Sequence, residues 1–141
     1  LLNNEGNRFV EREDRAVVLL NKSASLCDDI QYQKTIQSKD NYYPSPSVFV
    51  YTLPNIVTGE IAIRNKYYGE TSFLVIDDFD SETIQEVIEM AFQDEVTTSV
   101  LGGWLECKSE NEFEALVFIV EKQGEDNQKQ WNKENILRIR K

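Results

Sequence analysis

The fold is decided by residues 44–107, which read PSPSVFVYTLPNIVTGEIAIRNKYYGETSFLVIDDFDSETIQEVIEMAFQDEVTTSVLGGWLEC. We expect this stretch to form one α/β unit: a helix opened by a proline, a strand, a second helix, and a strand that runs into two glycines. The strand at its centre is 72–76, a short apolar run rich in β-branched and aromatic residues. Such a run is typical of a strand covered on both faces, because an exposed strand alternates apolar and polar residues. We therefore predict a central place for it in the sheet.

The expected fold class is α/β, with a mixed sheet of about five strands and helices packed on it. Strands are expected at 15–20, 72–76, 97–101, 113–120 and 136–140, the last as an edge strand, and helices at 28–37, 55–66 and 82–91. A chain of 141 residues suits one domain. Its first part, 1–14, is interpreted as a loop or the remnant of an upstream element.

Two of the expected helices carry specific signals at their ends. Pro54 falls in the first turn of helix 55–66, where its missing N–H costs nothing. This helix is apolar on most sides, so we expect it to be buried, with Gly59 as a packing site and Gly69 as a turn glycine after it. The helix at 82–91 is amphipathic, and Asp80 followed by Ser81 suits its N-cap. The first helix, 28–37, has few apolar residues and is expected on the surface.

Charge excludes some kinds of partner. The chain has 15 basic and 25 acidic residues, a formal net charge of −10. Binding to nucleic acid or to an anionic membrane needs a basic face, so neither is an expected partner. No apolar run approaches the roughly 20 residues of a membrane-spanning helix, and no secretion signal is evident. A cytoplasmic protein is expected.

Histidine is absent from the sequence. A Ser-His or Cys-His pair cannot come from this polypeptide alone, so acid-base chemistry would fall to carboxylates or lysines. Cys27 and Cys107 lie far apart without metal-ligand spacing, and we interpret them as reduced, mostly buried thiols rather than a disulfide. No cofactor and no metal are expected.

Four features from residue 15 to about 122 resemble the N-terminal half of a β-ketoacyl-[acyl carrier protein] synthase, a member of the thiolase-like superfamily. They are Leu53-Pro54-Asn55 followed by Gly59, the Gly69 turn into an apolar strand, the amphipathic helix, and the strand ending in Gly102-Gly103-Trp104-Leu105-Glu106, which is similar to the family's Gly-Gly-x-x-Glu. The resemblance implies a thiolase-like half domain. It also implies that the family's catalytic cysteine would fall at Asp77 or Asp78, so a catalytic residue is not expected at that position.

The same resemblance supplies the candidate site residues. The family's two histidines come from a C-terminal half that lies outside this sequence, and the strand 72–76 corresponds to one that pairs antiparallel across a dimer axis. Phe73, Leu74, Val75 and Ile76 are therefore the dimer-edge candidates. The ligand-pocket candidates are Asn55, Gly59, Asp77, Asp78, Phe79, Gly102 and Gly103.

Several residues have more than one interpretation. The cluster of Asp77, Asp78 and Asp80 could hold a hard metal ion or form an acid pair, but helix capping is the commoner use of such aspartates. Cys107 could be a displaced nucleophile or, as we favour, an inert core thiol. Gly102 and Gly103 could admit a ligand or serve tight packing. A pocket could be lined by Tyr42, Tyr43, Tyr51, Tyr67 and Tyr68, although tyrosines on loops and rims are common.

Three functions are compatible with these observations. The favoured one is a non-catalytic ketosynthase-like subunit, a pseudoenzyme that acts with an active synthase and an acyl carrier protein in fatty-acid or polyketide-type biosynthesis, as a homodimer or with a ketosynthase-like partner. The others are a split or atypical acyltransferase of the 3-oxoacyl-ACP synthase type completed by another chain, and an acyl-ligand binding module. Acyl carrier proteins are acidic, so docking one needs a basic patch. The candidates for that patch are Arg64, Lys66, Arg138, Arg140 and Lys141.

Overall fold

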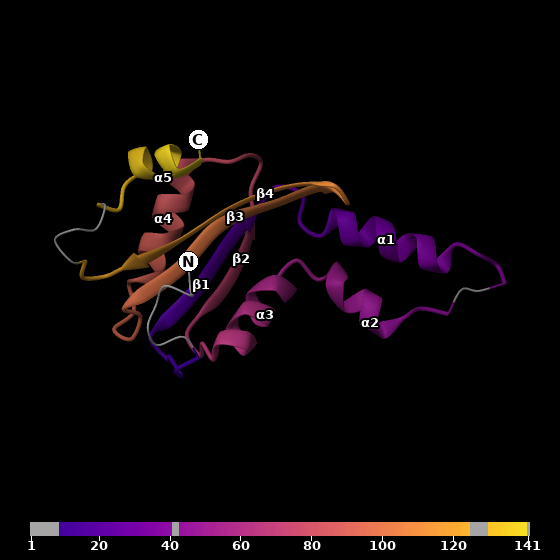
Figure 1. Cartoon of the computed structure of the whole chain (residues 1–141), viewed down its shortest axis with the longest axis horizontal. Coiled ribbons are helices and arrows are strands. Elements are labelled where there is room, and N and C mark those ends of the chain that lie inside the picture. Colours follow the sequence, from indigo (N-terminus) through magenta and orange to yellow (C-terminus); the bar gives the residue numbers. More distant parts are fainter. Residues whose placement is uncertain (1–8, 41–42, 125–129, 141) are drawn as a thin grey trace.

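A computed structural model of the chain describes residues 9–40, 43–124 and 130–140. Its centre is a mixed sheet of four strands, β1 (Arg15–Asn21), β2 (Thr71–Val75), β3 (Ser99–Ser109) and β4 (Glu112–Glu121), in the order β2-β1-β3-β4 (Figure 1). β1 is parallel to both β2 and β3, and β4 is antiparallel to β3. The α/β class with a mixed sheet is confirmed, with four strands in place of about five.

Helices cover both faces of this sheet (Figure 1). α3 (Ile56–Asn65) packs on one face, where Val17, Leu19 and Leu101 form a core cluster with Ala62. α4 (Ser81–Ala91) and α5 (Lys133–Arg140) pack on the other face, over the alternate residues of the same strands. Since side chains of a strand point to opposite faces in turn, β1 supplies both cores and is buried along its whole length.

A helical arm extends away from the sheet at the right of Figure 1. We use this name for residues 26–52, which contain α1 (Leu26–Ile36), α2 (Pro46–Phe49) and the 3-10 helix η2 (Val50–Thr52). None of the described residues in these three helices is buried. The surface position expected for the first helix is confirmed. The arm is joined to the loop after β1 by a hydrogen bond from Ser25 Oγ to the carbonyl oxygen of Thr52, at 2.6 Å.

Two predicted strands differ from the structure. β2 lies at the edge of the sheet, and its residues are exposed or half-buried, so the prediction of a central strand covered on both faces is wrong. Residues 136–140 are helical, not an edge strand. The side chain of Asn132 accepts a hydrogen bond from the backbone N–H of Asn135 at 2.9 Å and so caps α5, while only Ile136 is buried.

The region around α3 also corrects two glycine assignments. α3 buries only Thr58, Ala62 and Asn65, so it is covered on one side rather than buried. A Cβ on Gly59 would meet no atom within 4 Å, and Gly59 is therefore not a packing site. The left-handed residue that ends α3 is Lys66, with φ of 57°. Gly69 has another role: a Cβ there would lie 2.4 Å from the carbonyl oxygen of Arg15, so glycine allows the start of β2 to approach β1.

No helix in the described part of the chain is both long enough and apolar enough to cross a membrane.

Candidate functional site at the carboxyl ends of the parallel strands

The loops that follow β1 and β2 leave the sheet at the same edge, because the two strands are parallel. In open α/β sheets, ligands bind in the crevice outside the carboxyl ends of the strands. Residues 22–25 and 76–80 meet at this edge, where Lys22 Nζ and Asp78 Oδ2 form an ion pair at 3.8 Å. Both side chains are exposed, so this ion pair is a weak link between the loops.

The loop after β1 is held from both sides by buried polar groups. The Asn21 amide donates to the carbonyl oxygen of Ala24 at 2.8 Å, and its side-chain oxygen accepts from the Ala24 N–H at 3.0 Å. Glu106, which ends the Gly-Gly-x-x-Glu sequence, is 5% exposed, and its Oε2 accepts from the N–H groups of Lys22 at 2.7 Å and Ser23 at 3.3 Å. Glu106 therefore fixes the backbone of this loop. In the sequence, the signal for this role was a carboxylate within the mainly apolar run 100–107.

Two buried polar atoms near this loop have no hydrogen-bond partner among the described residues: Glu106 Oε1 and Trp104 Nε1. Trp104 and Glu106 are two positions apart on β3, so their side chains point to the same face of the sheet. The Glu106 carboxylate oxygen is an acceptor and the Trp104 indole N–H is a donor.

Phe79 packs against Trp104 and does not line the groove described below. Its ring meets the Trp104 ring edge to face with centroids 5.6 Å apart. The Arg140 guanidinium lies 3.9 Å from the Phe79 ring centroid, and Arg140 Nε donates to Glu114 Oε1 at 2.8 Å. The Phe79 ring therefore contacts the Trp104 indole edge to face and the Arg140 cation through its own face.

The three aspartates after β2 do not converge on one point. Asp80 is the N-cap of α4, since its carboxylate accepts from the N–H groups of Glu82 at 3.3 Å and Thr83 at 3.0 Å. Hydrogen bonds from the Thr83 hydroxyl and then its N–H lower the pKa of Asp80. Asp78 accepts from the Phe79 N–H, and Asp77 is exposed. The capping interpretation is confirmed for Asp80, and the described residues contain no group of three or more ligands that could hold a metal ion.

Gly102 and Gly103 lie inside β3 and not at its end. A Cβ on Gly102 would be 2.6 Å from both Ile88 Cδ1 and Phe118 Cε2, and one on Gly103 would be 2.3 Å from the carbonyl oxygen of Leu116. Both glycines therefore serve close packing, and neither borders space for a ligand. Asn55 precedes α3 and has an exposed side chain; its carbonyl oxygen accepts from Thr58 Oγ1 at 2.8 Å.

The other residues considered from sequence lie elsewhere. Cys107 is exposed and Cys27 is half-buried, so the expectation of mostly buried thiols is wrong. Tyr43, Tyr51 and Tyr68 are exposed, whereas Tyr67 is buried beneath Arg15. Tyr42 lies outside the described residues.

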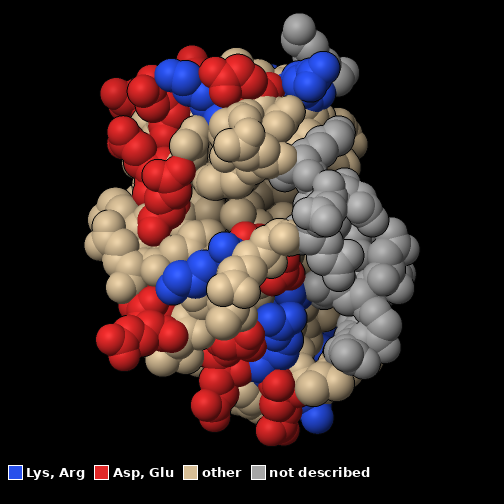
Figure 2. Space-filling model, turned by 90° about the vertical axis from the view of Figure 1, so that its left-hand side faces the viewer, with Lys and Arg blue, Asp and Glu red and all other residues tan. Residues whose placement is uncertain are grey.

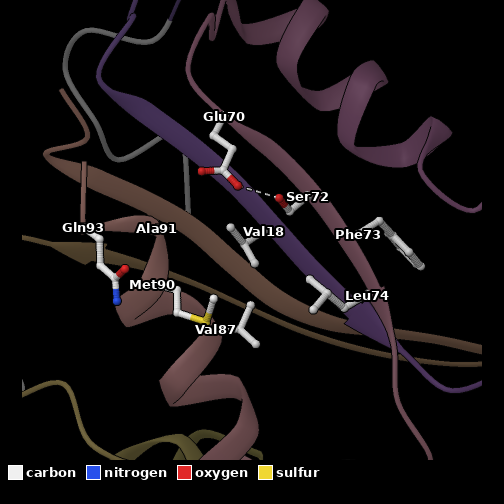
Figure 3. A pocket seen from close by; sticks show the side chains of 9 residues that line it. All are labelled: Val18, Glu70, Ser72, Phe73, Leu74, Val87, Met90, Ala91 and Gln93. Atoms are coloured by element: carbon white, nitrogen blue, oxygen red, sulfur yellow. Dashed lines mark hydrogen bonds between the residues drawn. The ribbon is translucent and has the colours of Figure 1, made fainter. Parts of the chain in front are cut away.

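A groove of about 470 Å³ runs between the free edge of β2 and the second half of α4 (Figure 3). Leu74 and Val87 point toward each other across it, and Ser72 Oγ donates to Glu70 Oε1 at 2.8 Å on its rim. The groove takes in two of the predicted dimer-edge residues, Phe73 and Leu74. Its α4 wall was missed from sequence, because the apolar stripe of an amphipathic helix is ordinarily assigned to the core. The residues on this side of the groove are Val87, Met90 and Ala91 of α4 and Gln93, which follows the helix.

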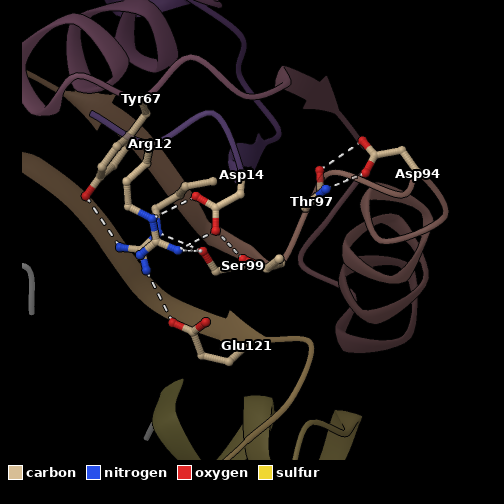
Figure 4. A network of polar contacts seen from close by, with 9 residues as sticks. Arg12, Asp14, Tyr67, Asp94, Thr97, Ser99 and Glu121 are labelled. Carbon is tan, nitrogen blue, oxygen red and sulfur yellow. Dashed lines mark hydrogen bonds and ion pairs between the residues drawn. The ribbon is translucent and has the colours of Figure 1, made fainter. Parts of the chain in front are cut away.

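The amino ends of the parallel strands carry a different kind of polar cluster (Figure 4). Arg15 is 1% exposed; it donates to Ser99 Oγ at 2.9 Å and forms an ion pair with Glu121 at 3.2 Å. Arg12 donates to both carboxylate oxygens of Asp14, at 3.0 and 2.9 Å, and this contact is the main reason why the pKa of Asp14 is held well below its usual range. Seen from this side, Lys and Arg side chains lie among Asp and Glu side chains (Figure 2). The cluster pairs its charges internally and so serves the fold.

Comparisons with known proteins agree with this architecture. The chain is similar in structure to a solved protein described as the ishigamide ketosynthase/chain length factor, with a TM-score of 0.66 and 18% sequence identity. The likeness covers 84% of this chain and 39% of that one, so it extends over less than half of the neighbour's length. No protein-family model and no curated protein sequence matches the chain.

Proposed function

We propose that this chain is a non-catalytic ketosynthase-like subunit that acts with an active 3-oxoacyl-ACP synthase and an acyl carrier protein, in fatty-acid or polyketide-type biosynthesis. The likeness of its fold to a ketosynthase/chain length factor protein supports this proposal. The family resemblance in the sequence points to the loop after β2 as the place where an active synthase carries its nucleophilic cysteine.

The observation that carries the proposal is the content of that loop. Asp77 and Asp78 are exposed carboxylates at the end of β2, and Asp78 is already engaged with Lys22 and the Phe79 N–H. Both cysteines lie elsewhere, Cys27 on α1 and Cys107 on β3. No thiol of this chain therefore follows β2, which is where acyl transfer in such a scaffold would require one.

The proposed partner contacts the free edge of β2. Among the described residues, β2 pairs with β1 on one side only, so its other edge offers backbone N–H and C=O groups to an additional strand. Residues Phe73 to Ile76 are apolar and the groove beside them is lined by α4. We propose that this edge pairs with the same edge of a second copy or of another ketosynthase-like subunit.

The acyl carrier protein is assigned to the partner subunit. Arg64 and Lys66 lie at the end of α3, while Arg138 and Arg140 lie on α5, which packs on the opposite face of the sheet. Lys66 pairs with Glu11 and Arg140 with Glu114. These cations therefore do not gather into one patch for an acidic carrier, and Lys141 lies outside the described residues.

The test is co-purification with a histidine-bearing ketosynthase, followed by size-exclusion chromatography. Val75→Lys places a charge on the β2 edge, where Val75 is 53% exposed, and should abolish the complex without unfolding the chain. Ile63→Lys is the matched control, because Ile63 is 83% exposed on α3. A stable monomer that ignores such partners, or a complex that survives Val75→Lys, contradicts the proposal.

A second candidate, an acyl-ligand binding module, is favoured by the groove itself. Its volume of about 470 Å³ lies within the usual range for small-molecule sites, roughly 300–1,000 Å³, and its walls are largely apolar. Acyl thioesters should then raise the thermal unfolding midpoint of the isolated chain. Mass spectrometry of the same mixtures checks the enzymatic alternative, since a covalent acyl adduct on Cys107 would show catalysis by this chain.

A further inference from the structure

The fold brings the chain's two cysteines together. Cys27 is the second residue of α1 and Cys107 lies near the end of β3, 80 positions later. The Cys27 thiol donates to the carbonyl oxygen of Cys107, with sulfur and oxygen 3.0 Å apart. The two side chains also contact each other through a hydrogen bond between the thiols, so a change of side-chain rotamer is enough to bring the sulfurs toward disulfide geometry.

The two thiols differ in access, and the surroundings of Cys27 favour its protonated form. A side-chain hydrogen bond to Cys107 raises the pKa of Cys27 to about 11, helped by desolvation and by the negative charges of Asp28 and Glu106 nearby. Cys27 therefore keeps its proton at neutral pH and is half-buried, whereas Cys107 is exposed. An oxidant from solvent meets Cys107 first, and Cys27 is placed as the second thiol.

We propose that Cys27 and Cys107 form a reversible intramolecular disulfide that fastens the helical arm to β3. With hydrogen peroxide as oxidant, the Cys107 thiolate attacks one peroxide oxygen, the O–O bond breaks, and the hydroxide released takes up a proton to become water. The Cys27 sulfur then attacks the Cys107 sulfenic acid, losing its proton, while the S–O bond breaks and a second water leaves. Both sulfurs are oxidised and one peroxide is reduced, and a dithiol such as dithiothreitol reverses the change.

Such a bond changes how the arm is held. In the reduced form, α1 meets the tip of the β3–β4 hairpin through Gln31 and Lys34, and both contact the single exposed carboxylate of Glu110. The disulfide adds a covalent attachment at the start of α1 to these weak contacts. It closes a loop of about 80 residues, for which chain entropy leads us to expect a rise in the unfolding midpoint on the order of 10 °C.

The experiment uses the reduced full chain treated with hydrogen peroxide. The expected product has lost two hydrogen atoms, a mass decrease of about 2 Da. Digestion without reductant should give one peptide pair that joins Cys27 to Cys107. In the oxidised protein, cleavage by trypsin at Lys34 and Lys39 should slow at least several-fold, and dithiothreitol should restore both the cleavage rate and the original mass.

Controls come from Cys27→Ser and Cys107→Ser, which should neither lose 2 Da by intramolecular cross-linking nor show the thermal shift on oxidation. The comparison of oxidised with reduced wild-type protein does not depend on either variant folding. Three results would overturn the proposal: a disulfide found only between two chains, both thiols still open to alkylation after oxidation, or a Cys27–Cys107 bond that leaves melting and trypsin cleavage unchanged.

Discussion

β1 and β2 are neighbouring parallel strands, and both have an apolar middle, but they differ in how far their residues are buried. Every residue of β1 is buried, while β2 has two exposed ends and a half-buried middle. The difference arises because β1 has a strand on each side and a helix layer on each face, whereas β2 has a strand on one side only in the part of the chain that the structure describes. An apolar run therefore indicates that a strand can be buried. Whether the strand is buried depends on its place in the sheet, which the crossover connections determine.

The two strands also differ at their ends. β1 begins at Arg15, which is paired with Ser99 and Glu121, and it ends at Asn21, beside the loop that Glu106 holds. β2 begins after the exposed Glu70 and ends before the exposed Asp77. β1 therefore organises the fold, whereas β2 is held to β1 at its two ends by backbone hydrogen bonds, from the Val17 N–H to the Glu70 carbonyl and from the Ile76 N–H to the Asn21 carbonyl.

The largest expected effect compares one leucine from each strand. Leu19→Ala in β1 removes a side chain that is 0% exposed, and it should reduce the free energy of unfolding by about 3 kcal/mol. Leu74→Ala in β2 should cost about 1 kcal/mol, because Leu74 is only partly buried beside the groove. Urea denaturation measures both. Equal losses would show that β2 is as well covered as β1.

The second prediction concerns the contact between the two strands. Gly69→Ala forces a methyl group against the carbonyl oxygen of Arg15 and should destabilise the chain by about 2 kcal/mol. Gly59→Ala is the matched control: it lies in helix α3 with no atom near its missing Cβ, and it should stabilise by about 0.5 to 1 kcal/mol. Thermal unfolding distinguishes the two, and a neutral Gly69→Ala would disprove the close approach.

The third prediction tests the anchor at the end of β1. Glu106→Ala leaves the N–H groups of Lys22 and Ser23 without their acceptor and should cost about 2 kcal/mol. Glu106→Gln keeps an oxygen in place and should lose less. Hydrogen exchange at these two amides should accelerate in the alanine variant and not in the glutamine variant; unchanged exchange in both would rule out the anchoring role.

The smallest effect is a pH dependence at the start of β1. The Arg12 contact lowers the pKa of Asp14 in the folded chain below its unfolded value of about 4, so its contribution to stability is complete above that pH and is lost as the pH falls further. The side chain is 35% exposed, which limits the effect to less than about 1 kcal/mol. Asp14→Asn should therefore flatten stability against pH below pH 4, as followed by circular dichroism. Parallel curves for the two proteins would exclude this role.

Local patterns were sufficient for much of the fold. The periodicity of 82–91 and the capping sequence at Asp80 predicted α4, and the apolar run at 15–20 predicted β1, because these signals depend on neighbours in the chain. The structure differed from the prediction where contacts with residues distant in sequence determine the secondary structure. Residues 136–140 alternate like a strand, but Asn132 caps them as a helix and Ile136 enters the core beneath α4.

The candidate site was less predictable for the same reason. The packing of Gly102 and Gly103 depends on Ile88, Phe118 and Leu116, which no local pattern links to them. The adjacency of Cys27 and Cys107 arises from how α1 leaves β1 and meets β3, 80 positions apart in sequence. The groove beside β2 exists because β2 is an edge strand. The apolar run at 72–76 had predicted a central strand, so the groove was not expected.

The helical arm gives the molecule two levels of cooperativity. The described residues of the arm contribute no buried side chain to either core, so their melting removes almost none of the apolar contacts that hold the sheet. Short helices without tertiary packing are marginal in water. Local unfolding of the arm is therefore expected to cost less free energy than unfolding of the sheet.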